Sequence, residues 1–330
     1  MAPQPTRPRI AIVCPATPES NNGNWRTARR WQHLLQGVSQ ARIVQHWPDA
    51  QAQRDEVMLA LHARKSAPSI AAWYARQGSQ GLGVALTGTD IYPDISRDAL
   101  AMRSLDRAAS LVLLQTQALQ ALPEVFRAKA RVIFQSCGER QALPKTSRHL
   151  RVLMVGHLRE EKNPHMLWRA VRAIAPNAGV RVDHIGVALD AALAHEATAT
   201  AQACPHYRWL HGLSHQDTLR RIQRAHLLVH TSRSEGGAIV ISEAIRCGTP
   251  VLATRIDGNV GLLGADYGGL VAPDDDATLT AQLLQCRAEQ TVPGTGLLQH
   301  WQAQCQARSA LFDPATERQA LQAWVLALRR

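Results

Sequence analysis

The stretch LLVHTSRSEGGAIVISEAIRCGTPVLATR, residues 227–255, carries the clearest structural pattern in the chain. It begins with a short apolar run at 227–230, which is followed by a turn rich in serine and glycine. From Ala238 about nine residues have helical spacing, and Gly-Thr-Pro at 248–250 ends that helix. A second apolar strand begins at Val251. The stretch therefore predicts a strand, a helix and a strand of one parallel sheet.

The turn that precedes this helix is suited to an anion. Gly236 and Gly237 allow backbone N–H groups to come close to a ligand, and a helix N-terminus favours negative charge. Glu235 and Glu243 are separated by seven residues, so one precedes the helix and the other lies about two turns along it. A carboxylate beside a phosphate accepts hydrogen bonds from hydroxyl groups such as those of a sugar or a ribose. The alternative to a ligand site is an ordinary parallel-sheet unit in which the two glutamates merely cap a helix or face water.

Composition favours a globular protein without a membrane segment. The chain has 330 residues, 45% of them hydrophobic and 19% charged, which suits two domains of ordinary size. No apolar run approaches the roughly 18 residues of a membrane span, so we expect a cytoplasmic protein with no membrane partner. Six scattered cysteines, without a C-x-x-C pair, predict neither a zinc site nor a disulfide framework.

The formal net charge of +11 requires an anionic partner. Nucleic acid is not expected, because the chain has no long basic run and only 5% aromatic residues. Small phosphorylated substrates account for the sign of the charge. The acidic run at 274–276 precedes a helical pattern, so we interpret it as a helix cap rather than as a metal site.

Strands and helices alternate along the chain, which predicts an α/β protein with two parallel sheets. The strands of the first sheet are predicted near residues 9–15, 42–47, 57–61, 82–87, 111–115 and 131–135. Those of the second sheet are predicted at 150–155, 180–185, 207–210, 227–230 and from 251, with helices at 164–175, 191–203 and 215–225. We place the first domain at 1–140, a linker at 141–149, the second domain at 150–300 and a helical tail at 301–330.

Polar loops follow several strands of the first domain. Because the carboxyl ends of parallel strands meet at one edge of a sheet, we expect these loops to share one crevice. Their candidate ligand-binding residues are Gly23, Asn24, Arg26, His62, Arg64, Lys65, Thr87, Thr89 and Asp90. For His62 a purely structural role is the alternative. The basic members favour an anionic ligand.

The glutamate pair, set between Ser-Arg-Ser and Cys-Gly-Thr-Pro-Val, resembles the E-x7-E signature of the retaining, nucleotide-sugar-dependent glycosyltransferases with the GT-B fold. The resemblance implies two Rossmann-like, doubly wound domains that face a central cleft, and a C-terminal helix that crosses back to the first domain. It implies that Glu235 contacts the transferred sugar, that Glu243 holds the ribose, and that no metal or other cofactor is needed. The donor-binding residues expected on this basis are Gly156, His157, Leu213, Ser234, Gly236, Gly237, Ala238, Ile239 and Glu243.

The loop that follows the strand at 150–155 resembles the G-R-L-x-x-x-K loop that clamps the donor pyrophosphate in this family. Lys162 fills the lysine position, but His157 stands where the family has arginine, and Arg159 is our candidate replacement. Cations placed in advance stabilise a departing diphosphate when no metal does so. We therefore expect Lys162, Arg159, Glu235 and His62 to form the catalytic set; an ordinary solvated loop is the alternative for the two cations.

A narrower resemblance covers nearly the whole chain. It rests on Gly23-Asn24 with Thr27 and Trp31, LHARKSA at 61–67, LTGTDIY at 86–92, GHLR with KNP at 156–164, SRSEGGA at 232–238 and RIDGNVGLLGADY at 255–267. Together these segments resemble the selenosugar synthases of selenoneine biosynthesis. The resemblance implies transfer of the sugar of UDP-N-acetylglucosamine, or of a related UDP-sugar, to selenophosphate. A carbon–selenium bond forms and gives a 1-selenosugar.

The same resemblance implies that the first domain binds selenophosphate and the second binds the UDP-sugar. It also implies functional coupling to an enzyme that supplies selenophosphate and to a downstream selenium-transferring enzyme. A glycosyltransferase with a UDP-sugar donor and a hydroxyl acceptor is the principal alternative. A protein that binds its ligand without turnover is another.

Overall fold

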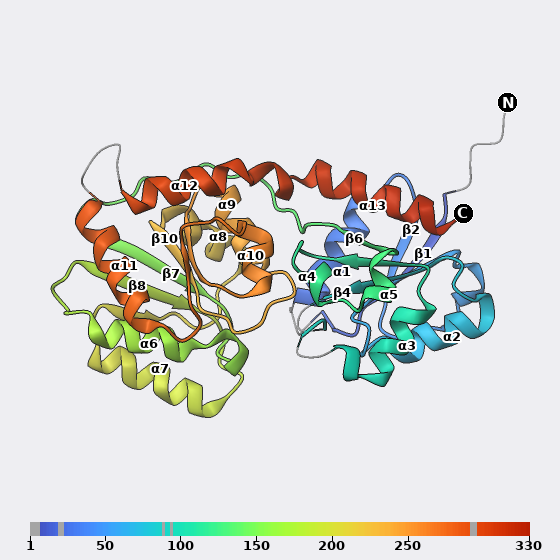
Figure 1. The fold of residues 1–330 in the computed structure, drawn as a ribbon, viewed down its shortest axis with the longest axis horizontal. Coiled ribbons are helices and arrows are strands. Elements are labelled where there is room, and N and C mark those ends of the chain that lie inside the picture. Colours follow the sequence, from blue (N-terminus) through green and yellow to red (C-terminus); the bar gives the residue numbers. More distant parts are fainter. Residues whose placement is uncertain (1–6, 19–22, 88–89, 93–94, 291–295) are drawn as a thin grey trace. The chain divides into compact units, whose positions relative to one another are not determined.

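The computed structural model describes residues 7–18, 23–87, 90–92, 95–290 and 296–330. The chain forms two compact units, of which unit 1 comprises Met1–Ser136 and Asp313–Arg330, and unit 2 comprises Cys137–Phe312. Each unit is built on a six-stranded sheet whose neighbouring strands all run parallel (Figure 1). The predicted α/β fold with two parallel sheets is confirmed. No helix within the described ranges is long and apolar enough to cross a bilayer.

The sheet of unit 1 has the strand order β2-β1-β3-β4-β5-β6. Its strands are β1 (Arg9–Val13), β2 (Gln40–Val44), β3 (Val57–Leu61), β4 (Leu82–Leu86), β5 (Ser110–Leu113) and β6 (Ala130–Val132). The central strands β3 and β4 are buried at every position, as expected where helices cover both faces of a parallel sheet. From β1 the chain adds β2 on one side, and then β3 and the later strands on the other side, so the order of the strands switches between β1 and β3. In a doubly wound sheet, the loops at the carboxyl ends of the strands beside such a switch commonly bind the ligand.

Helices cover both faces of this sheet. They are α1 (Gly23–Leu34), α2 (Ala67–Gln77), α3 (Ala99–Arg107), α4 (Ala118–Ala121), α5 (Glu124–Arg127) and α13 (Pro314–Leu328), with 3-10 turns η1 (Ala52–Arg54) and η2 (Ile95–Arg97). One core cluster unites α1 and α13 with the sheet, and Trp31 meets Trp324 there with ring centroids 5.7 Å apart. The other cluster, around Trp73 and Leu105, lies under α2 and α3.

Helix α13 reaches the sheet of unit 1 through a glycine. A Cβ atom on Gly83 of β4 would lie 2.4 Å from Cζ2 of Trp324, so any larger residue at 83 would push this helix away. Nε1 of Trp324 donates to Oγ of Ser110 at 3.0 Å, which satisfies the buried indole.

A buried acid also fixes α13. Glu317 is 1% exposed and lies 3.0 Å from Nε of Arg30. Its carboxylate accepts hydrogen bonds from Nε1 of Trp31 at 2.9 Å and from the backbone N–H of Ser136 at 2.7 Å. Because a buried charge is tolerated only when it is paired and hydrogen-bonded, these contacts specify where the helix docks.

The sheet of unit 2 has the order β12-β11-β10-β7-β8-β9. Its strands are β7 (Leu150–Val155), β8 (Val180–Ile185), β9 (Tyr207–Trp209), β10 (Leu227–His230), β11 (Val251–Thr254) and β12 (Leu270–Val271). Its helices are α6 (Pro164–Ala173), α7 (Ala191–Ala203), α8 (His215–Arg224), α9 (Ile239–Arg246), α10 (Asp257–Leu263), α11 (Asp276–Glu289) and α12 (Leu297–Ala307), with 3-10 turns η3 (Glu160–Lys162) and η4 (Ser309–Phe312). Asp275 accepts from the N–H of Thr278 and caps α11, so the capping interpretation of the acidic run is confirmed.

Two boundaries lie elsewhere than the sequence suggested. The expected linker at 141–149 belongs to unit 2, where the N–H of Leu143 donates to the carbonyl of Gln223 at 3.1 Å. The expected tail at 301–330 is divided: α12 packs in unit 2 through buried Trp301 and Cys305, and α13 packs in unit 1. A helical pattern shows that a segment must bury an apolar face, but it does not show against which sheet.

Candidate active site

Glu235 is a buried acid in the loop between β10 and α9. Nζ of Lys162 donates to its Oε1, and Nε2 of His230 lies 3.4 Å from the same oxygen. Burial alone raises the pKa of the Glu235 carboxyl, but the charge of Lys162 and the contact with His230 more than offset this effect. The pKa therefore lies well below its ordinary value. At neutral pH the carboxylate is charged and acts only as a hydrogen-bond acceptor.

Backbone contacts between two loops place Lys162 beside this acid. Lys162 ends η3, and Asn163 then turns the chain with a left-handed φ of 48°. Oγ1 of Thr231, directly after β10, lies 3.0 Å from the carbonyl of Lys162 and 2.9 Å from that of Asn163. The N–H of Arg233 donates to the carbonyl of Glu161 at 2.9 Å. The loops at the ends of β7 and β10 therefore form one fixed assembly.

Helix α10 supports Glu235 from the side. A Cβ atom on Gly258 would lie 2.2 Å from the carbonyl oxygen of Glu235 and 2.7 Å from its Cβ, so only glycine permits this approach. Oγ1 of Thr254 donates to the carbonyl of Ser232 at 2.5 Å, and Asn259 donates to the carbonyl of Thr254 at 2.9 Å. Nothing local in the sequence marks the role of Gly258, because its partner Glu235 is more than twenty residues away.

Glu243 lies in α9 and is 4% exposed. Its Oε1 lies 2.7 Å from Nε2 of His215, the first residue of α8, whose side chain is 54% exposed. Glu235 and Glu243 therefore have separate partners. His215 was missed in the sequence, although its place at the start of a helix, close to predicted donor residue Leu213, was the available signal.

The N-terminus of α9 has no side-chain cap. Ala238 occupies the capping position, and its methyl group cannot accept a hydrogen bond from the first N–H groups of the helix. Gly236 is buried, whereas Gly237 and Ile239 are partly exposed. Oγ of Ser234 is buried and has no partner among the described residues. An acceptor-rich ligand would satisfy these donors.

A buried chain of hydrogen bonds ends at Gly156, after β7. Nε1 of Trp168 donates to the hydroxyl of Tyr207 at 2.8 Å, and that oxygen lies 3.0 Å from Nδ1 of His184. Nε2 of His184 lies 3.2 Å from the carbonyl of Gly156, which can only accept. Burial lowers the pKa of His184 to about 4, so the ring is neutral and carries its proton on Nε2. Gly186 packs directly against the same carbonyl. A Cβ atom at position 186 would lie 1.9 Å from its oxygen, so a larger residue would clash there.

The two remaining members of the predicted phosphate clamp differ in placement. Nδ1 of His157 accepts from the N–H of Val187 at 3.2 Å, so this ring is engaged with its own loop. Arg159 is exposed and precedes η3. The structure therefore unites the side chains of Lys162 and Glu235. Arg159 meets Lys162 only through the backbone, where its carbonyl accepts from the N–H of Lys162 at 3.0 Å, and among the described residues its guanidinium makes no ion pair with Glu235.

In unit 1 the structure brings His62, Arg64 and Asp90 together. Nδ1 of His62 lies 2.9 Å from Oδ1 of Asp90, and His62 has a positive φ of 74°. Asp90 is fully buried and accepts hydrogen bonds from the backbone N–H groups of Ala63 and Arg64. Nε of Arg64 donates to Oδ2 of Asp98 at 2.7 Å. Many of the polar groups of this loop are therefore used in contacts that fix the conformation of the loop itself.

The other predicted residues of unit 1 lie in several separate segments. Lys65 is exposed, and Oγ1 of Thr87 is buried without a partner among the described residues. Gly23, Asn24 and Arg26 lie in the first turn of α1, where the carbonyl of Gly23 accepts from Oγ1 of Thr27. Thr89 lies outside the described residues. The ranges that the structure covers hold no cluster of three metal-ligating side chains.

Solved structures with a similar fold cover most of the chain. The chain is similar to HepE of Anabaena in complex with UDP and glucose, with a TM-score of 0.71, 16% identity and coverage of 97% of this chain and 99% of that chain. It is similar to the sucrose-phosphate synthase of Thermosynechococcus elongatus, with a TM-score of 0.76, 15% identity and coverage of 97% and 99%. The pneumococcal O-GlcNAc transferase GtfA, in complex with UDP and GlcNAc, has a TM-score of 0.63 and 15% identity, with coverage of 83% of this chain and 57% of that chain.

The two parallel sheets and these similarities define a GT-B fold, as the sequence predicted. Residues 138–290, all of them in unit 2, match the family of glycosyl transferases group 1. This match covers the part of the chain that carries Lys162, Glu235 and Glu243. No curated protein sequence matches the chain.

Proposed function

We propose that the protein is a glycosyltransferase and that unit 2 binds its donor, a UDP-sugar. The observation that carries this proposal is the buried Glu235–Lys162 pair beside the uncapped N-terminus of α9. HepE and GtfA, both similar in fold, were solved with UDP, which supports the choice of nucleotide.

The donor's charged and hydroxyl groups would have separate partners. The N–H groups around Gly236 and Gly237 would receive the diphosphate, because a helix N-terminus favours an anion. Glu243 would accept hydrogen bonds from the ribose hydroxyls, and His215 already orients that carboxylate. Glu235 would accept a hydrogen bond from the sugar.

Bond cleavage would depend on Lys162. As the bond from the anomeric carbon to the diphosphate oxygen breaks, negative charge develops on the departing UDP. Lys162 and the N-terminus of α9 would stabilise that charge, with the exposed Arg159 as a second cation. Lys162 and Glu235 are already paired as ions in the protein. When the donor binds, Lys162 would also contact the diphosphate and Glu235 would also contact the sugar, so neither group would have to change its charge.

We propose selenophosphate as the acceptor. Its selenium would attack the anomeric carbon while UDP departs, so that one carbon–selenium bond forms as one carbon–oxygen bond breaks. The immediate product keeps the phosphate on selenium, and attack of water on the phosphorus would then break the selenium–phosphorus bond and release phosphate and the 1-selenosugar. The six sequence segments that resemble selenosugar synthases support this choice. So do Arg64 and the exposed Lys65 at the carboxyl end of β3, since an anionic acceptor requires positive charge. An enzyme that supplies selenophosphate and one that uses the selenosugar would act before and after this step.

A hydroxyl acceptor is the second candidate. The His62–Asp90 pair favours it, because an imidazole oriented by a buried carboxylate is suited to remove a proton from a hydroxyl group. A selenium nucleophile is already reactive at neutral pH and has no need of such a base.

One incubation distinguishes these acceptors. The protein is given UDP-N-acetylglucosamine with selenophosphate, and the product is analysed by mass spectrometry for the selenium isotope pattern. Parallel reactions contain phosphate or glycerol in place of selenophosphate. A selenosugar formed by the protein, and not by Lys162→Met, supports the proposal. Transfer to glycerol alone would favour the hydroxyl acceptor, and UDP binding without any product would indicate a binding protein.

A further inference from the structure

One face of the β7–β8–β9 ladder in unit 2 carries charge where a parallel sheet normally carries apolar side chains. Arg151 pairs in register with Arg181, and Asp183 pairs with Arg208. Because neighbouring register partners and residues two apart on a strand share a face, all four side chains lie on one face of the sheet. The alternate positions, such as Val182, are buried on the opposite face. Parallel sheets usually have both faces covered, so this open face calls for an explanation.

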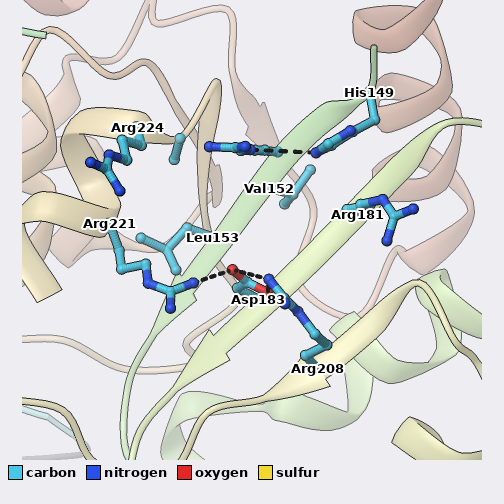
Figure 2. Close-up of a pocket in the computed structure, with 10 residues that line it drawn as sticks. His149, Val152, Leu153, Arg181, Asp183, Arg208, Arg221 and Arg224 are labelled. Atoms are coloured by element: carbon cyan, nitrogen blue, oxygen red, sulfur yellow. Dashed lines mark hydrogen bonds and ion pairs between the residues drawn. The ribbon is translucent and has the colours of Figure 1, made fainter. Parts of the chain in front are cut away.

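The charged face is the floor of a cavity of about 410 Å³ that helix α8 bounds on one side. Figure 2 shows Arg221 and Arg224 on that side, with Arg208 and Arg181 across the cavity from them and Asp183 in between. We call this cavity the arginine trench. It is defined by Arg151, Arg181, Arg208, Arg221, Arg224 and His149. A second hollow of about 620 Å³ shares His149 and Arg181 with it and extends the available space.

Positive charge in the trench exceeds what the protein itself balances. Asp183 accepts from Arg208 at 2.7 Å and from Arg221 at 3.0 Å. In contrast, Arg151, Arg181 and Arg224 form no ion pair with any acid in the described part of the chain. Burial lowers the pKa of His149 most, and the charges of Arg181 and Arg151 lower it further, as nearby cations do.

The trench is separate from the proposed donor site. His149 directly precedes β7, and Arg151 and Arg181 are the second residues of their strands. Lys162 and Glu235 instead lie in loops that follow the carboxyl ends of β7 and β10. A ligand of a doubly wound sheet binds at the carboxyl ends, so the donor does not account for cations at the amino ends.

We propose that the arginine trench binds a small polyanion that carries two or more phosphate groups. A guanidinium group matches a phosphate with two parallel hydrogen bonds, and arginine is preferred for this contact over lysine. The trench holds three arginines without an acidic partner among the described residues and two more that share Asp183. A single phosphate is too small to contact all of these guanidinium groups across the cavity. Several phosphates on one short molecule match both the charge and the space.

The test is isothermal titration calorimetry of the full chain with inorganic tripolyphosphate, in the presence of saturating UDP so that the donor site is occupied. The variant Arg181→Glu/Arg224→Glu reverses two trench charges that have no acidic partner. Arg103→Glu/Arg318→Glu changes the net charge equally in unit 1 and serves as the matched control. We expect the trench variant to bind tripolyphosphate at least tenfold more weakly and the control to change by less than twofold. Equal weakening in both, or no binding to the wild-type chain, would overturn the proposal.

Two further measurements keep the result interpretable. Arg181→Gln/Arg224→Gln removes the charges without adding acids, so it must also weaken binding even if the reversed variant misfolds. Co-sedimentation with phosphatidylcholine vesicles that contain phosphatidic acid shows whether the phosphates belong to a lipid surface. Vesicle binding that depends on Arg181 and Arg224 would support phosphate binding in the trench and would identify lipid headgroups as the source of the phosphates. A DNA duplex that binds the trench more tightly than tripolyphosphate would contradict the assignment to a small polyanion.

Discussion

Glu235 in unit 2 and Asp90 in unit 1 are both buried acids in the loop region that follows a parallel strand, yet their partners differ in kind. Glu235 is balanced by side chains, Lys162 and His230. Asp90 is held mainly by backbone N–H groups of the loop after β3 and by His62. Side-chain partners can be shared with a ligand, whereas backbone partners fix the loop. We infer that Glu235 serves the reaction and that Asp90 serves mainly to position His62 and Arg64.

Removal of Lys162 should have the largest effect. Lys162→Met leaves Glu235 buried without its cation and removes a cation from the departing diphosphate. We expect the rate of sugar transfer to fall by about a thousandfold and the free energy of unfolding by about 3 to 5 kcal/mol. Steady-state kinetics and urea denaturation measure the two. Lys162→Arg, which keeps the charge, is the control and should retain more of both; a Met variant with normal turnover would refute the role of Lys162.

Asp90→Ala should chiefly affect stability. It leaves the buried N–H of Ala63, the partly buried N–H of Arg64 and the ring of His62 without their acceptor, so we expect the free energy of unfolding to fall by about 3 kcal/mol. The affinity for UDP should be unchanged. Asp98→Ala, which removes a partly exposed helix cap and its ion pair with Arg64, is the comparison and should cost only about 1 to 2 kcal/mol. A stable Asp90→Ala protein with lost activity would mean that Asp90 acts directly in the chemistry.

Acid should weaken unit 2 through its histidines rather than through Glu235. Burial lowers the pKa of His184 and of His226 to about 4, below the value of about 6.5 for an exposed histidine. Between these values the unfolded chain binds more protons, so the stabilisation is complete above pH 6.5 and is lost as the pH falls toward 4. Each histidine should contribute about 1 to 3 kcal/mol to this loss. Urea denaturation between pH 7 and 4 measures it, and His226→Gln should make the pH dependence shallower.

The smallest effects should separate the two substrates. Glu243→Ala should weaken UDP binding by about tenfold, because it removes a charged acceptor for hydroxyl groups. Lys65→Ala should leave UDP affinity unchanged and raise the KM for the anionic acceptor severalfold. Calorimetry with UDP and kinetics with varied acceptor check this pair. Equal effects on donor affinity would contradict the division of roles between the units.

The fold was largely predictable because its signals are local. The strands predicted at 57–61, 150–155, 180–185 and 227–230 are observed with the same bounds, since a short apolar run between turn residues is typical of a buried parallel strand. Glu235 and Glu243 were singled out from their spacing around a glycine-rich helix start and from the segments that flank them. Whether the predicted site residues act as assigned stays a prediction.

What the sequence did not predict depends on distant partners. Gly258 matters because of Glu235, His215 because of Glu243, and His184 because of the carbonyl of Gly156. The division of the expected tail between the two units is of the same kind. Periodicity shows that a side chain is buried but not what buries it, so contacts between remote segments had to come from the structure.

The docking of α13 has a consequence for how the protein folds during its synthesis. The first 136 residues leave the ribosome long before Trp324 and Glu317 are synthesised, and the entire second unit is translated in between. Until that helix is made, the sheet face around Ile10 and Ile12 has α1 but lacks α13, and the space beside Gly83 is unfilled. We therefore expect the N-terminal sheet to mature last, and a nascent chain stalled before Asp313 to need the protection of chaperones.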